Sequence, residues 1–187
     1  IPKIDEIEFQ FIPEPTTRIS RLRSDNAGFV VDVPPKNFQS TKDAPDINAK
    51  SIAGSGSQVI YHNHVDTGDN PMSNLHNRRA VHYAVDAQEL LERVYRGQGV
   101  VQKGPWFPDS DWVPDSLKNM DMYDPERAKS ELQKGPNPDG FEVSLMASNS
   151  SVAGKTATII QSQLDEVGIT ANVNLLDTGS LFSRLYG

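Results

Sequence analysis

Residues 141–176 read FEVSLMASNSSVAGKTATIIQSQLDEVGITANVNLL, and this stretch decides the fold. Its two ends alternate apolar and polar residues, a pattern typical of β-strands with one buried face. Between these ends, apolar residues recur at helical spacing from Val152 to Val167. The order strand, helix, strand predicts a βαβ unit with parallel strands and a right-handed crossover. Gly168 lets the chain leave the helix in a left-handed turn.

The same unit predicts where a ligand would bind. In open α/β sheets the binding crevice lies beyond the carboxyl ends of the strands. The first of these ends leads into a helix N-terminus, where backbone N–H groups and hydroxyls can hold a carboxylate or amide oxygen. We therefore expect Ser148, Asn149 and Ser150 to face the ligand. A role of Asn149 or Ser150 as the N-cap of the helix is an equally strong interpretation.

A pair of helices with buried faces is predicted upstream, in residues 70–99, NPMSNLHNRRAVHYAVDAQELLERVYRGQG. Apolar residues follow helical spacing on both sides of a short interruption. In that interruption, Asp86 and Glu89 have the spacing of a capping box, which predicts that a second helix starts there. Gly97 supplies a left-handed stop. Two adjacent arginines are expected on a solvated face, Arg78 and Arg79.

The rest of the chain fits a mixed α/β protein. Alternating or β-branched residues predict further strands at 7–11, 29–33 and 59–61. The stretch 36–50 is expected to be a polar loop. Residues 52–57 are rich in Gly and Ser, as in a phosphate-binding loop, but the P-loop lysine is missing from them. We interpret this segment as an ordinary loop.

Two further helices are predicted. A short one covers residues 17–23, and a second begins at Pro125 with Asp124 as its N-cap and Gly135 closing it. The segment before the second helix is rich in proline and aromatic residues, which predicts an extended crossing on the surface. Its aromatic side chains are expected to pack the loop onto the domain rather than to stack on a ligand. They are Trp106, Phe107 and Trp112.

Composition argues against several functional classes. The formal net charge is -7 and no long Lys/Arg tract is present, which argues against a nucleic-acid partner. No apolar run approaches the roughly 20 residues that cross a bilayer. The absence of cysteine excludes disulfides, thiolate catalysis and Cys-ligated zinc. Because the sequence also lacks a Gly-x-Ser-x-Gly elbow and a His-Glu-x-x-His helix, we expect no enzyme, no catalytic residue and no cofactor.

Three of the four histidines suggest the alternative function, a metal-dependent hydrolase or metal-binding module. His62 and His64 would project from the same face of a strand, with Asp66, Asp69 and His76 downstream as further ligands. A zinc or nickel site needs three or four converging ligands, and spacing alone does not show convergence. We therefore expect no metal site.

The chain also resembles a known family, the extracellular solute-binding proteins that serve ABC importers of oligopeptides, dipeptides and nickel. The helix pair at 70–99 resembles the family's proline-led PLxDxRVRQALxYAIDxxxIxxxVxxGxG stretch. Further matches occur in the same order as in the family. They are Ile4-Asp5-Glu6-Ile7, Val33-Pro34-Pro35, Tyr123-Asp124-Pro125-Glu126, Pro138-Asp139-Gly140-Phe141, and Gln163-Leu164 with Gly168-Ile169.

Two departures from the family pattern stand out. Asp25-Asn26-Ala27-Gly28 stands where the family usually has Gly-Glu-Val-Asp, which puts the local turn near Asp25 in question. His76-Asn77 stands where the family has Arg-Val before the helix arginine. In dipeptide binders of the family the loop at 148–151 can carry an arginine that grips the ligand. None occurs here, which weakens a free peptide carboxylate as ligand.

The resemblance implies a fold, a domain organisation and a function. Members of the family are far longer than 187 residues, so the chain is expected to be an internal fragment of a periplasmic-binding-protein-like α/β fold. Residues 1–62 would belong to the first lobe and 63–187 to the second. The parent would capture a peptide or other small polar solute between its lobes and deliver it to a membrane permease. It would be periplasmic or extracellular, held at the membrane by the transporter or a lipid anchor.

Overall fold

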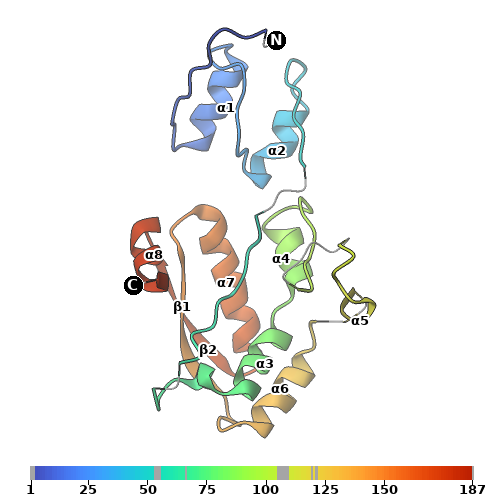
Figure 1. The fold of residues 1–187 in the computed structure, drawn as a ribbon, viewed down its shortest axis with the longest axis vertical. Helices are drawn as coiled ribbons and strands as arrows, with labels where there is room; N and C mark the ends of the chain where they lie inside the picture. Colours follow the sequence, from blue (N-terminus) through green and yellow to red (C-terminus); the bar gives the residue numbers. More distant parts are fainter. Residues whose placement is uncertain are drawn as a thin grey trace. The chain divides into compact units, whose positions relative to one another are not determined.

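The computed structural model describes residues 3–52, 56–65, 67–104, 110–118, 120 and 122–186. The chain divides into two compact units, Ile1–Ile52 and Ala53–Gly187 (Figure 1). The structure therefore places a boundary between units just after Ile52. None of the helices in the described ranges is long and apolar enough to cross a membrane.

The first unit contains two helices, α1 (Pro15–Arg23) and α2 (Pro35–Lys42). The predicted helix at 17–23 is confirmed and begins two residues earlier. Helix α2 corrects the prediction of a polar loop at 36–50. Pro34-Pro35 is typical of the end of a strand, but Pro35 occupies the first helical turn, where its missing N–H costs nothing and its fixed φ favours the helix.

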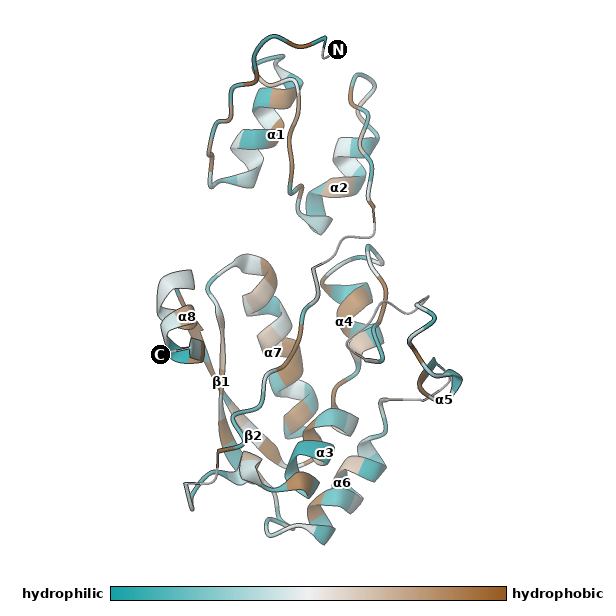
Figure 2. Cartoon of the chain, viewed as in Figure 1, coloured by the Kyte–Doolittle hydropathy of each residue, from teal (hydrophilic) through white to brown (hydrophobic). Residues whose placement is uncertain are grey.

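The strands predicted at 7–11, 29–33 and 59–61 are not formed. Hydrophobic residues along these segments lie outside any helix (Figure 2). Phe9 is 80% exposed and Phe29 is 82% exposed, so the predicted half-buried face is also absent. Alternation gives a segment two faces, but a strand also needs a hydrogen-bonded neighbour for its backbone. Within the described residues, the only ladder joins two other segments.

That ladder is the βαβ unit, which is confirmed. Strand β1 (Phe141–Ser148) leads into α7 (Ser151–Asp165), and β2 (Ile169–Leu176) returns parallel to β1. The register runs from Phe141 opposite Ile169 to Ser148 opposite Leu176. Gly168 has φ 91°, the left-handed conformation expected for it.

Two glycines set the start of the ladder. Gly140 has φ 97° and precedes β1, and a Cβ added to it would lie 1.8 Å from the carbonyl oxygen of Gly168. This backbone-to-backbone approach leaves no room for any side chain at position 140. The close approach thus requires glycine at position 140, whereas at position 168 it is the left-handed φ of 91° that favours glycine.

The predicted helix pair is also present, as α3 (Leu75–Ala84) and α4 (Ala87–Arg93), preceded by a short 3₁₀ turn, η1 (Pro71–Ser73). Asp86 caps α4 by accepting from the N–H of Gln88 at 2.9 Å and of Glu89 at 3.0 Å. Gly97 has φ 72° and supplies the predicted left-handed stop.

The other predicted hydrogen bond of the capping box, from the Asp86 N–H to the Glu89 side chain, is not formed. The Glu89 carboxylate does not reach back to the N–H of Asp86. Instead, the N–H of Asp86 donates to Oε1 of Gln163 on α7 at 3.2 Å, and Nε2 of Gln163 donates to Glu89 at 2.5 Å. Gln163 is only 4% exposed, so these bonds form in a buried junction between α4 and α7.

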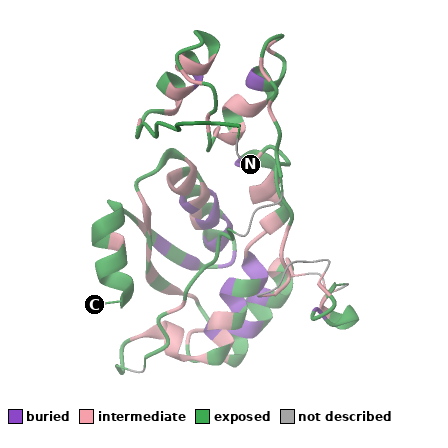
Figure 3. Ribbon diagram, turned by 45° about the horizontal axis from the view of Figure 1, so that its top comes forward, coloured by how far each residue is buried: buried purple, intermediate pink, exposed green. Residues whose placement is uncertain are grey.

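Helix α6 (Pro125–Lys134) starts at its predicted cap, where Asp124 accepts from the N–H of Arg127 at 2.9 Å. Two elements were not predicted, α5 (Asp115–Lys118) and α8 (Thr178–Tyr186). The main core lies between α3, α6, α7 and one face of the sheet, where buried residues concentrate (Figure 3). Its members are Ala80, Val81, Tyr83, Ala84, Ala128, Leu132, Ile160, Leu164, Val167, Ile169 and Ala171.

The aromatic loop differs from its prediction in the part that the structure describes. Trp112 is 77% exposed and is not packed against the domain, whereas its neighbour Val113 is 5% exposed. The loop is therefore anchored by Val113 and not by the larger Trp112. Trp106 and Phe107 lie outside the described residues, as do residues 53–55 of the Gly/Ser segment.

The departure at Asp25 has a clear structural role. Asp25 follows α1 with φ 57°, the left-handed conformation that a glycine adopts without strain. Its N–H donates to the carbonyl of Leu22 at 3.3 Å, and the N–H of Asn26 donates to the carbonyl of Arg21 at 2.9 Å. The turn is therefore kept, with aspartate in a conformation that favours glycine.

Replacing Asp25 with Gly should stabilise the protein. The substitution removes the left-handed strain of a residue that carries Cβ, which is worth about 1 kcal/mol. Urea denaturation should show a higher midpoint with an unchanged slope. Asp43→Gly, at the end of α2 where φ is -79°, is the matched control and should not stabilise. An equal gain in both variants would contradict this explanation.

Replacing Gly140 with Ala should strongly destabilise the βαβ unit. The new Cβ would collide with the Gly168 carbonyl, and the residue would carry φ 97°. We expect a loss of about 2 kcal/mol or more in the free energy of unfolding. Urea denaturation measures it, with Gly28→Ala as control because no atom lies within 4 Å of a Cβ there. Equal stability of G140A and G28A would contradict the close approach.

Candidate functional site

The three predicted ligand-facing residues lie together where β1 ends and α7 begins. Ser150 caps α7, its Oγ accepting from the N–H of Ala153 at 3.2 Å. The hydroxyls of Ser148 and Ser150 are 3.1 Å apart and share a hydrogen bond. The N–H of Asn149 donates to the carbonyl of Leu176 at 2.8 Å, which extends the contact between the two strands by one residue.

These contacts divide the three residues by role. Ser150 has the capping role that the sequence left open, and its hydroxyl is already engaged. Asn149 uses only its backbone, and its exposed side chain forms no hydrogen bond with the described residues. Asn149 is therefore the residue of the three whose amide is free to contact a solute.

The second carboxyl end of the sheet, residues 177–180, carries a charge whose capping role the sequence analysis does not predict. Asp177 follows β2 and caps α8, with Oδ1 accepting from the Ser180 N–H at 3.0 Å and Oδ2 from the Ser180 hydroxyl at 2.6 Å. Hydrogen bonds from the Ser180 side chain and backbone lower the pKa of the Asp177 carboxyl. The sequence does contain a pattern that predicts this cap, because Asp followed three residues later by Ser is a local capping pattern.

The edge is therefore polar, with a single anionic group. It combines the N-terminus of α7, two serine hydroxyls, one free amide and the Asp177 carboxylate. The ammonium group of Lys155, on the same helix, donates to the Arg93 carbonyl at 2.8 Å rather than to a residue of this edge. Such an arrangement can hydrogen-bond a neutral polar group or an amide.

The predicted ligands His62, His64 and His76 do not come together as a metal site in the described part of the chain. Nδ1 of His64 lies 3.3 Å from the carbonyl of His62, which is a local contact. His76 instead contacts Glu131 on α6, with Nδ1 and Oε2 2.8 Å apart. No group of three or more His, Cys, Asp or Glu side chains that could hold a metal ion occurs among the described residues. Asp66, one of the proposed ligands, lies outside them.

The environment of His62 is cationic. Burial lowers the pKa of His62 first, and the nearby Arg78, His82 and His64 lower it further. Arg78 itself is not on a fully solvated face as predicted. Its Nη1 donates to the carbonyls of Met72 at 2.8 Å and Ser73 at 2.7 Å, which ties η1 to α3. Arg79 is exposed, as predicted.

The departure at His76-Asn77 forms a polar junction between α3 and its neighbours η1, α6 and the loop after α6. Asn77 is fully buried, and its Nδ2 donates to the Pro71 carbonyl and to Oδ1 of Asn137, both at 2.8 Å. Glu131 is 5% exposed. Hydrogen bonds from His76 and Lys134 hold the pKa of the Glu131 carboxyl at about 2.

Solved structures define the class of protein to which this fold belongs. The chain is similar to the periplasmic binding protein AgaA of A. tumefaciens, solved with agropinic acid, at 27% identity and a TM-score of 0.70 over 91% of this chain and 34% of that one. It also resembles a Pseudoalteromonas dipeptide-binding protein solved with Met-Leu, at 24% identity and a TM-score of 0.75 over 93% and 34% of the two chains. The mixed α/β, periplasmic-binding-protein-like fold is thereby confirmed.

A family model gives the more specific assignment. The model described as "Bacterial extracellular solute-binding proteins, family 5 Middle" matches residues 1–185. The chain belongs to this family, as the sequence motifs predicted.

Characterised relatives are binding proteins by name. The glutathione-binding protein GsiB of Pectobacterium atrosepticum is 27% identical over 189 residues, covering 100% of this chain and 36% of that protein. Heme-binding protein A of Haemophilus influenzae is 27% identical over 175 residues, covering 90% and 31% of the two chains. The chain thus spans about a third of the length of these relatives.

The Glu131 junction should make stability depend on pH. The pKa of Glu131 is lowered from 4.5 to about 2 in the folded state, so its contribution is complete above pH 4.5 and is lost as pH falls toward 2. Glu131→Gln should therefore lower the free energy of unfolding at neutral pH, by about 2 kcal/mol. Urea denaturation from pH 7 to pH 2.5 should show the difference from the unchanged protein shrinking below pH 4.5.

Glu126→Gln is the matched control for this prediction. Glu126 pairs with Lys129 on the same helix, but its side chain is 84% exposed. Exposed pairs contribute little, so this variant should change stability by less than about 0.5 kcal/mol. A pH-independent effect of E131Q would show that the carboxylate charge is not what stabilises the junction.

Proposed function

We propose that this chain is part of the substrate-binding component of an ABC importer, which captures a peptide or other small polar solute between two lobes. The observation that carries the proposal is the family match over residues 1–185. The relatives' names support solute binding in general, and their ligands differ, from glutathione to heme. They therefore support the class of function and leave the solute open.

The edge at the end of β1 supports a role for this chain in the binding cleft. Ser148, Asn149 and Ser150 are our proposed contacts, with Asn149 as the one whose side-chain amide is free. A second lobe closing over this edge would add its own polar groups and exclude water. Open and closed states would then differ by the contacts each makes with the solute.

The apolar segments of the first unit support the presence of further chain around it. Phe11 is 97% exposed and Ile7 is 64% exposed, and both lie in a segment with strand-like alternation. Large exposed apolar side chains in such a segment mark a surface that another element covers. We propose that segments of the longer parent pair with 7–11 and 29–33 and complete a first lobe of residues 1–62. Residues 63–187 would begin the second lobe.

The family also supports a location and a partner. Its members are extracellular by description, so we propose that the parent works in the periplasm or outside the cell. It would hand its solute to a membrane permease, held nearby by the transporter or by a lipid anchor. The absence of Arg and Lys from residues 148–151 and 177–180 favours solutes that present amides or hydroxyls to this edge rather than a free carboxylate.

Ligand screening of the full-length parent tests this function. Thermal-shift assays with C-terminally amidated and free peptides, sugars and nickel chelates should reveal at least one stabilising solute. Asn149→Ala should then weaken its binding about tenfold, the effect of losing one or two buried polar contacts, with little change in stability. Isothermal titration calorimetry measures the change.

Asn172→Ala provides the matched control. Asn172 bears the same amide on the exposed face of β2, where it bonds to Glu142 and lies away from the carboxyl edge. Its loss should leave solute affinity unchanged. Equal affinities of N149A and the unchanged parent would remove Asn149 from the cleft. Equally tight binding of the solute by residues 1–187 alone would contradict the two-lobe mechanism.

A further inference from the structure

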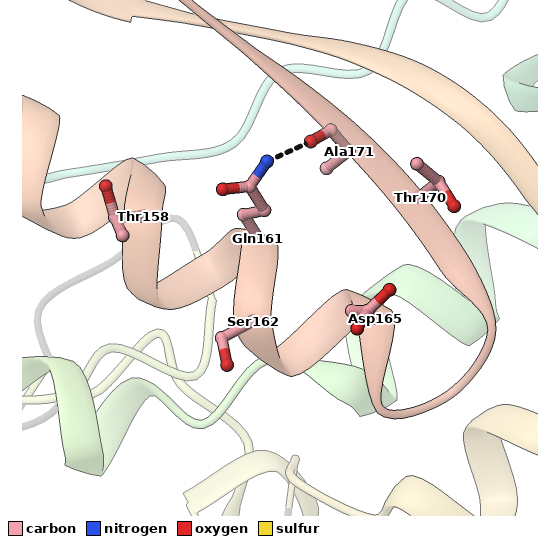
Figure 4. A pocket seen from close by; sticks show the side chains of 6 residues that line it. All are labelled: Thr158, Gln161, Ser162, Asp165, Thr170 and Ala171. Carbon is pink, nitrogen blue, oxygen red and sulfur yellow. Dashed lines mark hydrogen bonds between the residues drawn. The ribbon is translucent and has the colours of Figure 1, made fainter.

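The outer edge of β2 offers backbone hydrogen-bonding groups in a known register. The carbonyl of Leu176 accepts from Asn149, so even-numbered residues of β2 direct their backbone groups toward β1. Backbone groups alternate along a strand in a parallel ladder, so those of Val173 and Leu175 face the opposite side. The Ala171 carbonyl shows this directly, because it accepts from Nε2 of Gln161 at 2.6 Å on that side (Figure 4).

This edge lacks the usual protection against pairing. Strand β2 reads ITANVNLL and contains neither a charged residue nor a proline. Natural edge strands are commonly blocked by such residues, by bulges or by a covering element. Only Ala171 is covered, by the Gln161 side chain, and no side chain or loop of the described residues bonds to the outward backbone groups of Val173 and Leu175.

A hollow of about 370 Å³, with both polar and apolar lining, lies beside the same edge. Residues of α7 and β2 line it, as Figure 4 shows. Its lining residues are Thr158, Gln161, Ser162, Asp165, Thr170 and Ala171.

The hollow is rich in hydrogen-bond acceptors. Gln161 has used its nitrogen on Ala171, which leaves Oε1 as an acceptor. The Thr158 hydroxyl donates to the Gly154 carbonyl at 3.1 Å and retains its lone pairs. Asp165 forms no ion pair with any described residue. Acceptors around a single unpaired carboxylate favour a cationic donor such as a guanidinium or ammonium group.

We propose that the outer edge of β2 and this hollow form a docking site for an extended, basic peptide segment of a partner protein. The segment adds a strand beside Val173 and Leu175 and places an arginine or lysine next to Asp165. Charge complementarity selects this occupant over a second copy of the chain, because the net charge of -7 opposes self-association and β2 supplies no cation. The site is separate from the solute-binding edge at Asn149.

The test uses the full-length parent and a labelled probe, acetyl-Thr-Val-Arg-Val-Thr-amide, followed by fluorescence polarisation at 0.15 M salt. Blocked termini remove the charges that a peptide-binding cleft would recognise. The probe should bind, the same peptide with Glu in place of Arg should bind at least tenfold more weakly, and backbone N-methylation should abolish binding. Asp165→Asn should lower the affinity for the probe about fivefold, which is the effect of losing one charge-assisted contact.

Glu166→Gln is the matched control, since it removes one exposed carboxylate from the next position, which does not line the hollow. It should leave probe affinity unchanged. Equal effects of D165N and E166Q would overturn the site, as would no binding at all. Loss of probe binding in N149A but not in D165N would place the probe in the solute cleft. A concentration-dependent dimer without probe binding would assign the edge to a second copy and overturn the proposal.

Discussion

The close approach of Gly140 to Gly168 is the constraint on which the βαβ unit depends. It starts the two strands side by side, and the parallel register then brings Ser148 opposite Leu176 at the other end. Because of that register, the N–H of Asn149 reaches the Leu176 carbonyl and the two loops of the carboxyl edge meet. The candidate solute site is thus positioned by a backbone contact at the opposite end of the sheet, where no side chain fits.

Polar side chains join the helices that cover this unit. Gln163 reaches from α7 to the start of α4 and replaces half of a local capping box. Two residues of α3 depart from the family pattern: His76 contacts Glu131 on α6, and Asn77 bonds to Asn137 in the loop that follows α6. Buried polar groups of this kind stabilise only when their partners are present, so they specify one arrangement of the helices. The departures therefore belong to the packing of this particular chain.

Some strand-like parts of the described chain have no strand paired with them on at least one side. Exposed aromatic residues at 7–11 and 29–33 have strand-like alternation but no ladder, whereas β2 has a ladder on one side only. The two cases differ in chemistry. The first unit presents apolar side chains, which fit the interior of a completed lobe. The β2 edge presents backbone groups beside a hollow that holds an unpaired carboxylate, which fit the external strand that we propose. Our proposal for the first case rests on the family match over 1–185, and the second involves only α7 and β2.

The sequence alone determined the elements whose signals are local. Alternation and helical spacing predicted the βαβ unit, Asp86 and Asp124 marked helix starts, and motif order predicted the family. The position of loop 148–151 between a strand and a helix also followed from the sequence. That this loop contacts a solute is our proposal. Only the tertiary structure decided whether 7–11 finds a partner, that Trp112 is exposed, and that Gln163 completes a cap. Periodicity reports which faces a segment has, whereas pairing and burial depend on residues far away in the chain.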